Sequence, residues 1–373
     1  MKLLATVTLN ENQLRAHLLP ILALPTVEEL VLVADERPPE LPKLRAVVPS
    51  RAERRALGRA GSKLLLCARE ARRQRPDWVL SWNIMPHGLN GLVAGRIAGA
   101  RTAYHMIGGE VEWAGGGWRS DNSVLGRLPR PVPPLERGLF GVVRRSDAVC
   151  TMGHRARQAL VARGVDPARV FVTPPAVDVE RFRPDPSARP LYDLVSVGEL
   201  IPTKRLNDFI GIVERLRARR PGLRAAVAGI GPLRDELVAE AERRGLAGSI
   251  DFLGFRADIE HVYRSGRVFV LTSRYEGLSV AMTEALASGL PVVVSDVGEL
   301  RDLVEDGRSG RLLPVGDVAA FAAAIEELLG DERRYEQASA AARKSAVERA
   351  SVPVLSAVYR RILAGPEEEE SGR

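Results

Sequence analysis

Two glutamates in the stretch SRYEGLSVAMTEALASGLPVVVSD have the types and the spacing to do chemistry. Glu276 stands before a glycine in a predicted turn, and Glu284 follows eight positions later in a predicted helix. Ser279 is a suitable cap for that helix. The first backbone amides, near Leu278 and Ser279, lack partners within the helix, which favours an anionic group such as a diphosphate. Glu276 has the wrong charge for a diphosphate and is expected to face hydroxyl groups, whereas Glu284 is placed to accept hydrogen bonds from a ribose diol.

Short apolar runs alternate with helical patterns along the chain, which predicts parallel βαβ units whose sheets are covered on both faces. The expected strands are residues 2–8, 27–34, 44–49, 77–82, 101–107, 147–152 and 169–174, then 192–198, 223–229, 250–254, 267–273, 291–296 and 310–315. The fold class is therefore α/β, with two Rossmann-like doubly wound domains. A ligand is expected at the carboxyl ends of their strands, in a cleft between the domains.

Domain boundaries follow from the prolines. Five of them lie in residues 173–190, which show no helical period, so the sequence predicts a linker over residues 176–190. The sequence therefore predicts an N-terminal Rossmann-like domain over residues 1–175 and a C-terminal Rossmann-like domain over residues 191–350. Residues 351–373 are expected to form a helix, free to return to the N-terminal domain, and an acidic tail.

The pattern S-x2-EG-x6-EA-x2-SG-x-PVV closely resembles the nucleotide-binding signature of one large family. These are the retaining nucleotide-sugar glycosyltransferases with the two-domain GT-B fold, of the group 1 or family 4 type. Further stretches resemble the same family at the expected places, namely VGELIPTKR, AGIGPLRDEL, IDFLGFRADIEHVYRSGRVFV and SDVGELRDLVEDGRSGRLL. The resemblance is dense over residues 191–320 and holds only in outline in the N-terminal half.

The resemblance implies that residues 1–175 form the acceptor-side domain and that residues 191–350 form the nucleotide-sugar-binding domain. It also implies roles for particular residues. Lys204 would neutralise the leaving diphosphate, Glu276 would touch the transferred sugar, and Glu284 would hold the ribose. His105, at the end of the strand 101–107, resembles a histidine that the family presents to the donor sugar, although a core histidine is an alternative. Further donor contacts are implied for Gly198, Leu278, Ser279, Gly229, Gly231 and Phe255.

Two departures from the family pattern put the identity of the donor in doubt. Glu199 stands where the family commonly has arginine, so we expect Arg205 or Arg274 to substitute. The glycine pair that often follows the first strand is absent from TLNENQL, where Asn10 or Asn12 would supply side-chain donors instead.

Acceptor contacts are expected from two places in the N-terminal half. His87, in MPHGLNGL, opens a predicted helix near the same cleft. Residues 108–134 form a long loop rich in glycine and proline, and a loop of that length is usually functional or disordered. Its Trp113 and Trp118 favour an ordered loop on the acceptor side.

The predicted reaction moves a sugar from a UDP- or GDP-sugar to a hydroxyl of a glycan or a lipid-linked acceptor, with retention at the anomeric carbon. No Asp-x-Asp cluster stands out, so no essential metal and no cofactor are expected. Two alternatives stay open, a nucleotide-sugar-binding protein without transferase activity and a sugar-nucleotide epimerase. A glycosidase pair of glutamates is disfavoured because a glycosidase needs no phosphate partners. The stretch AGIGPL resembles part of a dinucleotide-binding motif, but Arg234 stands in place of its third glycine. Binding of a nicotinamide dinucleotide is therefore disfavoured.

Positive charge is concentrated in the N-terminal half, where residues 1–185 hold 28 basic and 18 acidic side chains. Residues 51–75 alone hold nine basic and two acidic groups around an apolar LLLCA stripe, which fits either an anionic membrane surface or a plain solvated helix. No nucleic-acid motif accompanies the charge. Without a long apolar span or a signal peptide, and with two cysteines in apolar settings, the expected location is cytoplasmic, with a peripheral place on the inner face of the membrane as an alternative.

Overall fold

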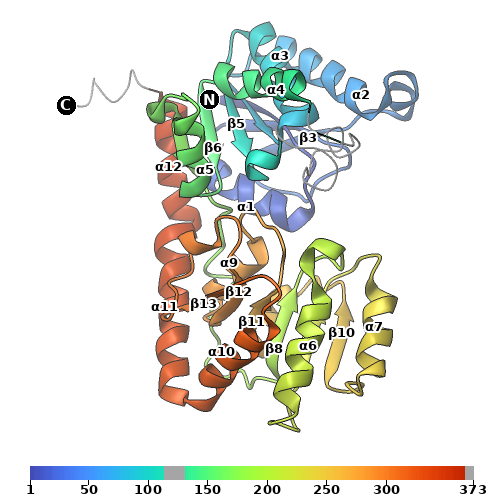
Figure 1. Ribbon diagram of the computed structural model, residues 1–373. Coiled ribbons are helices and arrows are strands. Elements are labelled where there is room, and N and C mark those ends of the chain that lie inside the picture. The colour runs from blue at the N-terminus through green and yellow to red at the C-terminus, as the bar shows by residue number, and fades with distance from the viewer. Residues whose placement is uncertain (113–129, 131, 366–373) are drawn as a thin grey trace, which may run out of the picture. The chain divides into compact units, whose positions relative to one another are not determined.

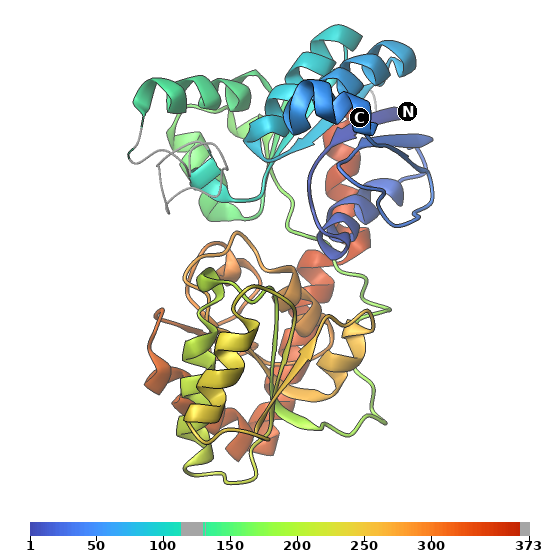
Figure 2. The same cartoon turned by 90° about the vertical axis from the view of Figure 1, so that its right-hand side faces the viewer.

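The computed structural model describes residues 1–112, 130 and 132–365 (Figure 1). The chain divides into two compact units. The first unit contains Met1–Ala176 together with Val352–Arg373, and the second contains Val177–Ser351. Each is built on a parallel β-sheet with helices on both faces (Figure 2), so the predicted fold class of two doubly wound α/β domains is confirmed.

The first unit holds a seven-stranded sheet in the order β3-β2-β1-β4-β5-β6-β7. Its strands are β1 (Lys2–Thr6), β2 (Glu29–Val33), β3 (Leu44–Val47), β4 (Trp78–Trp82), β5 (Arg101–Met106), β6 (Ala148–Thr151) and β7 (Val170–Val172). Strand order reverses between β1 and β4, which are hydrogen-bonded neighbours. In open α/β sheets, ligands bind beyond the carboxyl ends of the strands at such a reversal.

Helices cover both faces of this sheet. They are α1 (Glu11–Leu22), α2 (Arg51–Gln74), α3 (Leu89–Ala98), α4 (Pro133–Arg145), α5 (His154–Ala162) and α12 (Val352–Ala364), with a π-helical turn η1 (Ile84–Gly88) and 3-10 turns η2 (Gly109–Glu112) and η5 (Pro167–Arg169). Buried side chains of α1 and α12 pack on one face, and those of α2 to α5 pack on the other. The last helix is fixed there by hydrogen bonds, since Trp78 Nε1 donates to Leu363 O (3.1 Å) and Ser356 Oγ donates to Pro20 O (2.8 Å).

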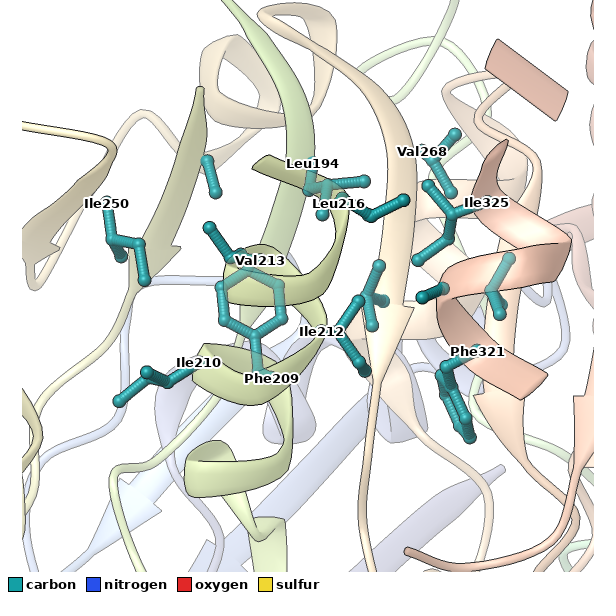
Figure 3. Close-up of a cluster of buried hydrophobic side chains, with 14 of the residues drawn as sticks. Leu194, Phe209, Ile210, Ile212, Val213, Leu216, Ile250, Val268, Phe321 and Ile325 are labelled. Carbon is teal, nitrogen blue, oxygen red and sulfur yellow. The ribbon is translucent and has the colours of Figure 1, made fainter. Parts of the chain in front are cut away.

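The second unit holds a six-stranded sheet in the order β10-β9-β8-β11-β12-β13. Its strands are β8 (Tyr192–Val197), β9 (Ala225–Ala228), β10 (Ile250–Gly254), β11 (Gly266–Leu271), β12 (Val292–Ser295) and β13 (Gly310–Leu313). Its helices are α6 (Leu206–Arg217), α7 (Arg234–Arg243), α8 (Ile259–Arg264), α9 (Val280–Ala287), α10 (Val318–Gly330) and α11 (Glu332–Ala350), with 3-10 turns η6 (Pro202–Lys204) and η7 (Leu300–Asp302). Figure 3 shows one core of this unit, in which Phe209 and Ile212 of α6 and Phe321 and Ile325 of α10 pack with the sheet residues Leu194 and Val268.

The proline-rich segment predicted as a linker is grouped with the second unit from Val177 onward. Its Phe182 is 5% exposed, and its backbone is held by α11, because the Arg343 guanidinium donates to Phe182 O (2.7 Å) and Val179 O (2.9 Å). Residues 176–190 form no helix, as the lack of a helical period indicates. The sequence pattern did not show that this segment packs against α11.

Cys67 and Cys150 are buried and unpaired, as their apolar settings predict. Burial raises the pKa of each thiol to about 12, so neither is a thiolate at neutral pH. In the described ranges, no helix is both long and apolar enough to cross a bilayer.

Candidate functional site

The two loops that carry the predicted catalytic residues of the second unit follow neighbouring strands. Lys204 lies in η6, directly after β8, and Glu276 lies in the loop between β11 and α9. β8 and β11 pair in parallel at the reversal of strand order, so both loops leave the same edge of the sheet at its switch point. The fold therefore brings together two side chains that are 72 residues apart in the sequence.

Lys204 and Glu276 form a close ion pair. Lys204 Nζ donates to Glu276 Oε1 at 2.6 Å, and Ser273 Oγ donates to the same oxygen at 2.6 Å. The side chains are 20% and 10% exposed, so solvent reaches the pair without surrounding it. Two hydrogen bonds join the loops, since Thr272 Oγ1 donates to Lys204 O (2.9 Å) and Arg274 N donates to Thr203 O (2.8 Å).

A glycine that the sequence reasoning missed supports the Glu276 loop from the next strand. Gly298 has φ of +55°, and a Cβ at this position would lie 2.0 Å from Glu276 O. Beside it, Glu299 N donates to Gly277 O at 2.8 Å. Only glycine allows this approach of two backbones. The sequence did contain a signal, because Gly298 in SDVGEL closely follows a predicted strand. A glycine at such a place usually indicates a turn, and the sequence does not show which loop it contacts.

The start of α9 has the features expected of an anion site. Ser279 is the N-cap, and its Oγ accepts a hydrogen bond from Met282 N (3.2 Å). Within the part of the chain that the structure describes, the amides of Leu278 and Ser279 meet no acceptor. Amides at a helix start carry partial positive charge, so this turn suits a phosphate.

Glu284 lies in the middle of α9 and is 7% exposed. Its Oε2 accepts a hydrogen bond from the hydroxyl of Tyr263 in α8, at 2.8 Å. Burial raises the pKa of Glu284 to about 7, and the Tyr263 hydrogen bond opposes that rise. The sequence reasoning did not single out Tyr263, because nothing local links α8 to α9.

The predicted glycines Gly198, Gly229 and Gly231 bring the loops after β8 and β9 into contact. A Cβ on Gly229, whose φ is +148°, would lie 1.8 Å from Gly198 O, and one on Gly231 would lie 2.5 Å from Leu200 O. A backbone hydrogen bond from Leu200 N to Ile230 O (2.9 Å) also joins the two loops. These glycines therefore have a backbone-packing role whether or not a nucleoside also lies beside them.

The remaining predicted donor contacts differ among themselves. Arg205 is bound in a bidentate ion pair by Asp208 (2.6 and 3.1 Å), so as placed it does not replace the missing arginine near Glu199. Glu199 is exposed. Phe255 follows β10, and 69% of its surface is exposed, which leaves an aromatic face open at the carboxyl edge of the sheet.

His105 is a core residue in the first unit, and the expectation that it faces the donor is wrong for this structure. Its register partner in β4 is Trp82, and the two rings stack with centroids 4.1 Å apart. Tyr359 of α12 packs on the same ring, 5.8 Å away, and His105 is 1% exposed. Burial lowers the pKa of His105 to about 3, so the ring is neutral. Strand alternation points it inward, which a reading of strand ends alone does not reveal.

His87 is also buried, so the prediction of direct acceptor contact is corrected. Its Nδ1 lies 2.8 Å from Thr6 Oγ1 and its Nε2 lies 3.1 Å from Thr8 Oγ1. Burial lowers the pKa of His87 to about 3. Both ring nitrogens are therefore occupied, and the ring organises the loop after β1 rather than facing a ligand.

A buried ion pair, which the sequence reasoning missed, adjoins His87. Lys63 Nζ of α2 donates to Asp35 Oδ2 (2.8 Å) and Thr8 Oγ1 (3.0 Å), and Arg59 binds the same carboxylate through two hydrogen bonds of 2.9 Å. Burial alone would raise the pKa of Asp35, but these hydrogen bonds hold it well below its usual range. We name Asp35, Lys63, Arg59, Thr8 and His87 the switch-point cluster, because they gather where the order of the first sheet reverses. The sequence offered one signal for this cluster, because Asp35 directly follows the predicted strand 27–34.

Asn10, predicted to face the substrate, instead caps α1. Its Oδ1 accepts from Gln13 N (3.0 Å), and Gln13 Oε1 accepts from Asn10 N (3.3 Å), which completes a capping box. Trp113 and Trp118 lie outside the described residues.

Two family models match the chain. The model described as glycosyl transferases group 1 matches residues 180–345, and the model described as Glycosyltransferase Family 4 matches residues 28–181. The chain belongs to the group 1 glycosyltransferases, and its two α/β units have the GT-B architecture.

Curated relatives include two D-inositol 3-phosphate glycosyltransferases. That of Mycobacterium marinum is 33% identical over 227 residues, which are 56% of this chain and 48% of the relative. That of Mycobacterium bovis is 33% identical over 266 residues, which are 65% and 54%. The chain thus spans about half the length of the curated relatives it matches.

Among solved structures, Anabaena HepE in complex with UDP is similar at a TM-score of 0.76 and 19% identity, covering 98% of this chain and 100% of HepE. HepE with UDP and glucose gives a TM-score of 0.78 with 98% and 99% coverage. At this identity the likeness establishes the fold alone.

Proposed function

We propose that the chain is a retaining glycosyltransferase that moves a sugar from a nucleotide diphosphate sugar to a hydroxyl of an acceptor. The observation that carries the proposal is the 2.6 Å pair of Lys204 and Glu276, together with the amides of Leu278 and Ser279 at the start of α9, which meet no acceptor among the described residues. One cation and one helix start suit a diphosphate, and one carboxylate suits sugar hydroxyls.

Departure of the nucleotide is the step that this site would assist. Negative charge grows on the bridging phosphate oxygen as the bond to the sugar breaks, and a group already in place stabilises it without reorganising. One such donor is worth about 3–4 kcal/mol. Lys204 binds Glu276 in this structure, so an incoming diphosphate would compete with Glu276 for the ammonium group. The released carboxylate would then be available to the hydroxyls of the donor sugar.

The donor we propose is a UDP- or GDP-sugar. HepE of similar fold was crystallised with UDP and with UDP-glucose, which supports a uridine nucleotide without fixing it for this chain. The curated relatives are named for a phosphorylated polyol acceptor, which supports a hydroxyl acceptor. We propose no role for a bound metal or cofactor, because Lys204 and the amides at the start of α9 supply the positive charge that the diphosphate needs.

Nucleotide release tests the proposal. Purified protein is incubated with a panel of UDP- and GDP-sugars and polyol, glycan and lipid-linked acceptors, with and without EDTA. We expect one donor to release nucleotide in the presence of an acceptor, EDTA to have no effect, and the product to keep the anomeric configuration of the donor by NMR. Glu276→Gln is expected to lower the rate at least 100-fold while nucleotide still binds. Glu336→Gln, on an exposed position of α11, is the matched control and should leave the rate unchanged.

The two alternatives give different results in the same assay. Binding of nucleotide without turnover by any acceptor would favour a binding protein. Conversion of the donor sugar in the absence of acceptor would favour an epimerase. Equal rates for Glu276→Gln and wild type would remove Glu276 from the mechanism.

We also propose that the outer face of α2 and α3 contacts an anionic lipid surface, at which a lipid-linked acceptor would be met. The two helices pack side by side (Figure 1). Leu65, Arg69 and Arg72 share one side of α2 at helical spacing, and Leu89, Val93 and Arg96 do so on α3. Leu65, Leu89 and Val93 are 40–44% exposed. Apolar side chains flanked by arginine are the features of an interfacial helix. A cytoplasmic location on the inner face of the membrane goes with this proposal.

Flotation with liposomes tests the surface. We expect binding to vesicles containing phosphatidylglycerol and little binding to pure phosphatidylcholine. Arg69→Glu with Arg72→Glu should lower the bound fraction at least tenfold, since each basic group near an anionic surface contributes about 1 kcal/mol. Arg215→Glu with Arg333→Glu makes the same change of charge at exposed positions of the second unit and should have little effect. Equal losses for both pairs would show that net charge, and not this face, governs binding.

A further inference from the structure

Tyr263 is wholly buried, and its hydroxyl donates a hydrogen bond to one carboxylate, that of Glu284. It lies in α8, is 0% exposed, and donates to Glu284 Oε2 at 2.8 Å. Its ring is held by Phe182 on one side (5.9 Å, edge-on) and Phe269 of β11 on another (6.2 Å). The hydroxyl therefore has little freedom to move away from Glu284.

One oxygen of Glu284 is left over. Tyr263 occupies Oε2, and among the described residues no donor reaches Oε1. The residue is 7% exposed, and Oε1 itself is not sealed from solvent, so a hydroxyl of a ligand can reach this oxygen. A cis-diol offers two O–H donors to such an atom and its neighbour.

We propose that Tyr263 is a positioning residue, which fixes the rotamer of Glu284 and favours its ionised form so that Oε1 can accept from the ribose diol of the nucleotide. This inference rests on the proposed function, because it takes Glu284 to be the ribose contact. It adds a residue that does not itself touch the ligand.

The charges around Glu284 support that role. Burial raises the pKa of Glu284 to about 7, the Tyr263 hydrogen bond and the charge of Arg181 lower it, and Glu260 raises it. Arg181 is itself bound by Glu260 (3.1 and 2.8 Å), so its effect on Glu284 is largely offset. Two other elements pack against α9. Arg343 of α11 donates to Ala287 O, at the end of α9 away from Glu284, and β12 has the uncharged sequence VVVS. Tyr263 is thus the only direct hydrogen-bond donor to this carboxylate among the described residues.

The consequence is a pH dependence of nucleotide binding. The group accepts diol hydrogen bonds best when it is ionised, so the preference for ribose should grow as pH rises through about 7. Tyr263→Phe removes the donor that favours the ionised form, which raises the pKa of Glu284 further. In the variant the preference should then appear only at higher pH, and at pH 7 it should be about tenfold weaker.

Calorimetry with UDP and 2′,3′-dideoxy-UDP between pH 6 and 9 tests this. The ratio of the two affinities cancels the titration of the phosphate, which both ligands share. We expect the ratio to rise with a midpoint near pH 7 in wild type and at least one pH unit higher in Tyr263→Phe. Tyr192→Phe is the matched control, because Tyr192 also donates to a carboxylate, Asp251 Oδ2, at 2.8 Å in the same sheet, and it should leave the ratio unchanged.

The outcomes separate the two levels of the proposal. If wild type binds neither UDP nor GDP, the proposed donor fails. If wild type binds UDP and its dideoxy analogue equally at every pH, Glu284 does not hold the ribose and the inference is overturned even if Tyr263→Phe fails to fold. If the ratio is large in wild type and its midpoint is the same in Tyr263→Phe, the tyrosine has only a packing role.

Discussion

Lys204→Met is expected to lower the rate of sugar transfer about 10²–10³-fold, with a smaller change in nucleotide affinity. The substitution keeps the length and the apolar part of the side chain but removes the only ammonium group that contacts Glu276 in the described chain. Charge on the departing diphosphate would then be met by the amides at the start of α9 without the ammonium group of Lys204. Initial-rate measurements with the donor found in the nucleotide-release assay give kcat and KM separately, and the loss should fall mainly on kcat.

Lys344→Met is the matched control for this change. Lys344 lies on α11 with 69% of its side chain exposed, so the same chemical change there should leave kcat within twofold of wild type. Melting curves of both variants establish that each is folded. A Lys204→Met protein that is folded and keeps more than a tenth of the wild-type kcat would show that this lysine does not stabilise the leaving group.

The architecture could be predicted because its signal is local. Each of the thirteen predicted strands has a counterpart in the structure, as for residues 192–198, which contain β8, and residues 291–296, which contain β12. Parallel strands buried on both faces are continuous apolar runs, and turn residues separate them from helical periods. The roles of Lys204 and Glu276 were implied by the family resemblance. Both residues lie in loops that follow strands, and all carboxyl ends of a parallel sheet lie on one edge.

The errors arose where function depends on which side chain lies opposite in space. His105 ends a strand, but whether it faces solvent depends on Trp82 in the neighbouring strand and on Tyr359, more than 250 positions away in the sequence. Asn10 was a helix cap, which the Gln13 three residues later indicates. Tyr263 could not be found, because its partner lies on another helix. Spacing identifies the loops of this fold, whereas register and packing decide which of their side chains remain available.

Asp35→Ala is expected to destabilise the first unit by about 3–5 kcal/mol, which is the usual cost of removing one partner of a buried ion pair. The Lys63 side chain is 2% exposed, so loss of Asp35 leaves an ammonium group that water cannot solvate. Lys63→Met should cost less, because Asp35 keeps both hydrogen bonds from Arg59. The double variant Asp35→Ala with Lys63→Met should be more stable than Asp35→Ala alone, because no buried charge then remains unpaired.

Urea unfolding followed by tryptophan fluorescence isolates this effect, because all four tryptophans of the chain precede residue 177. The pH dependence supplies a second check. Hydrogen bonds from Arg59, Lys63 and Thr8 hold the pKa of Asp35 below its unfolded value of about 3.9, so its contribution is complete above that pH and is lost as pH falls through the folded pKa. The difference in stability between wild type and Asp35→Ala should accordingly be the same at pH 7 and pH 5 and shrink only below about pH 4. A difference under 1 kcal/mol at pH 7, or a double variant no more stable than Asp35→Ala, would mean that water or a neighbouring group compensates Lys63.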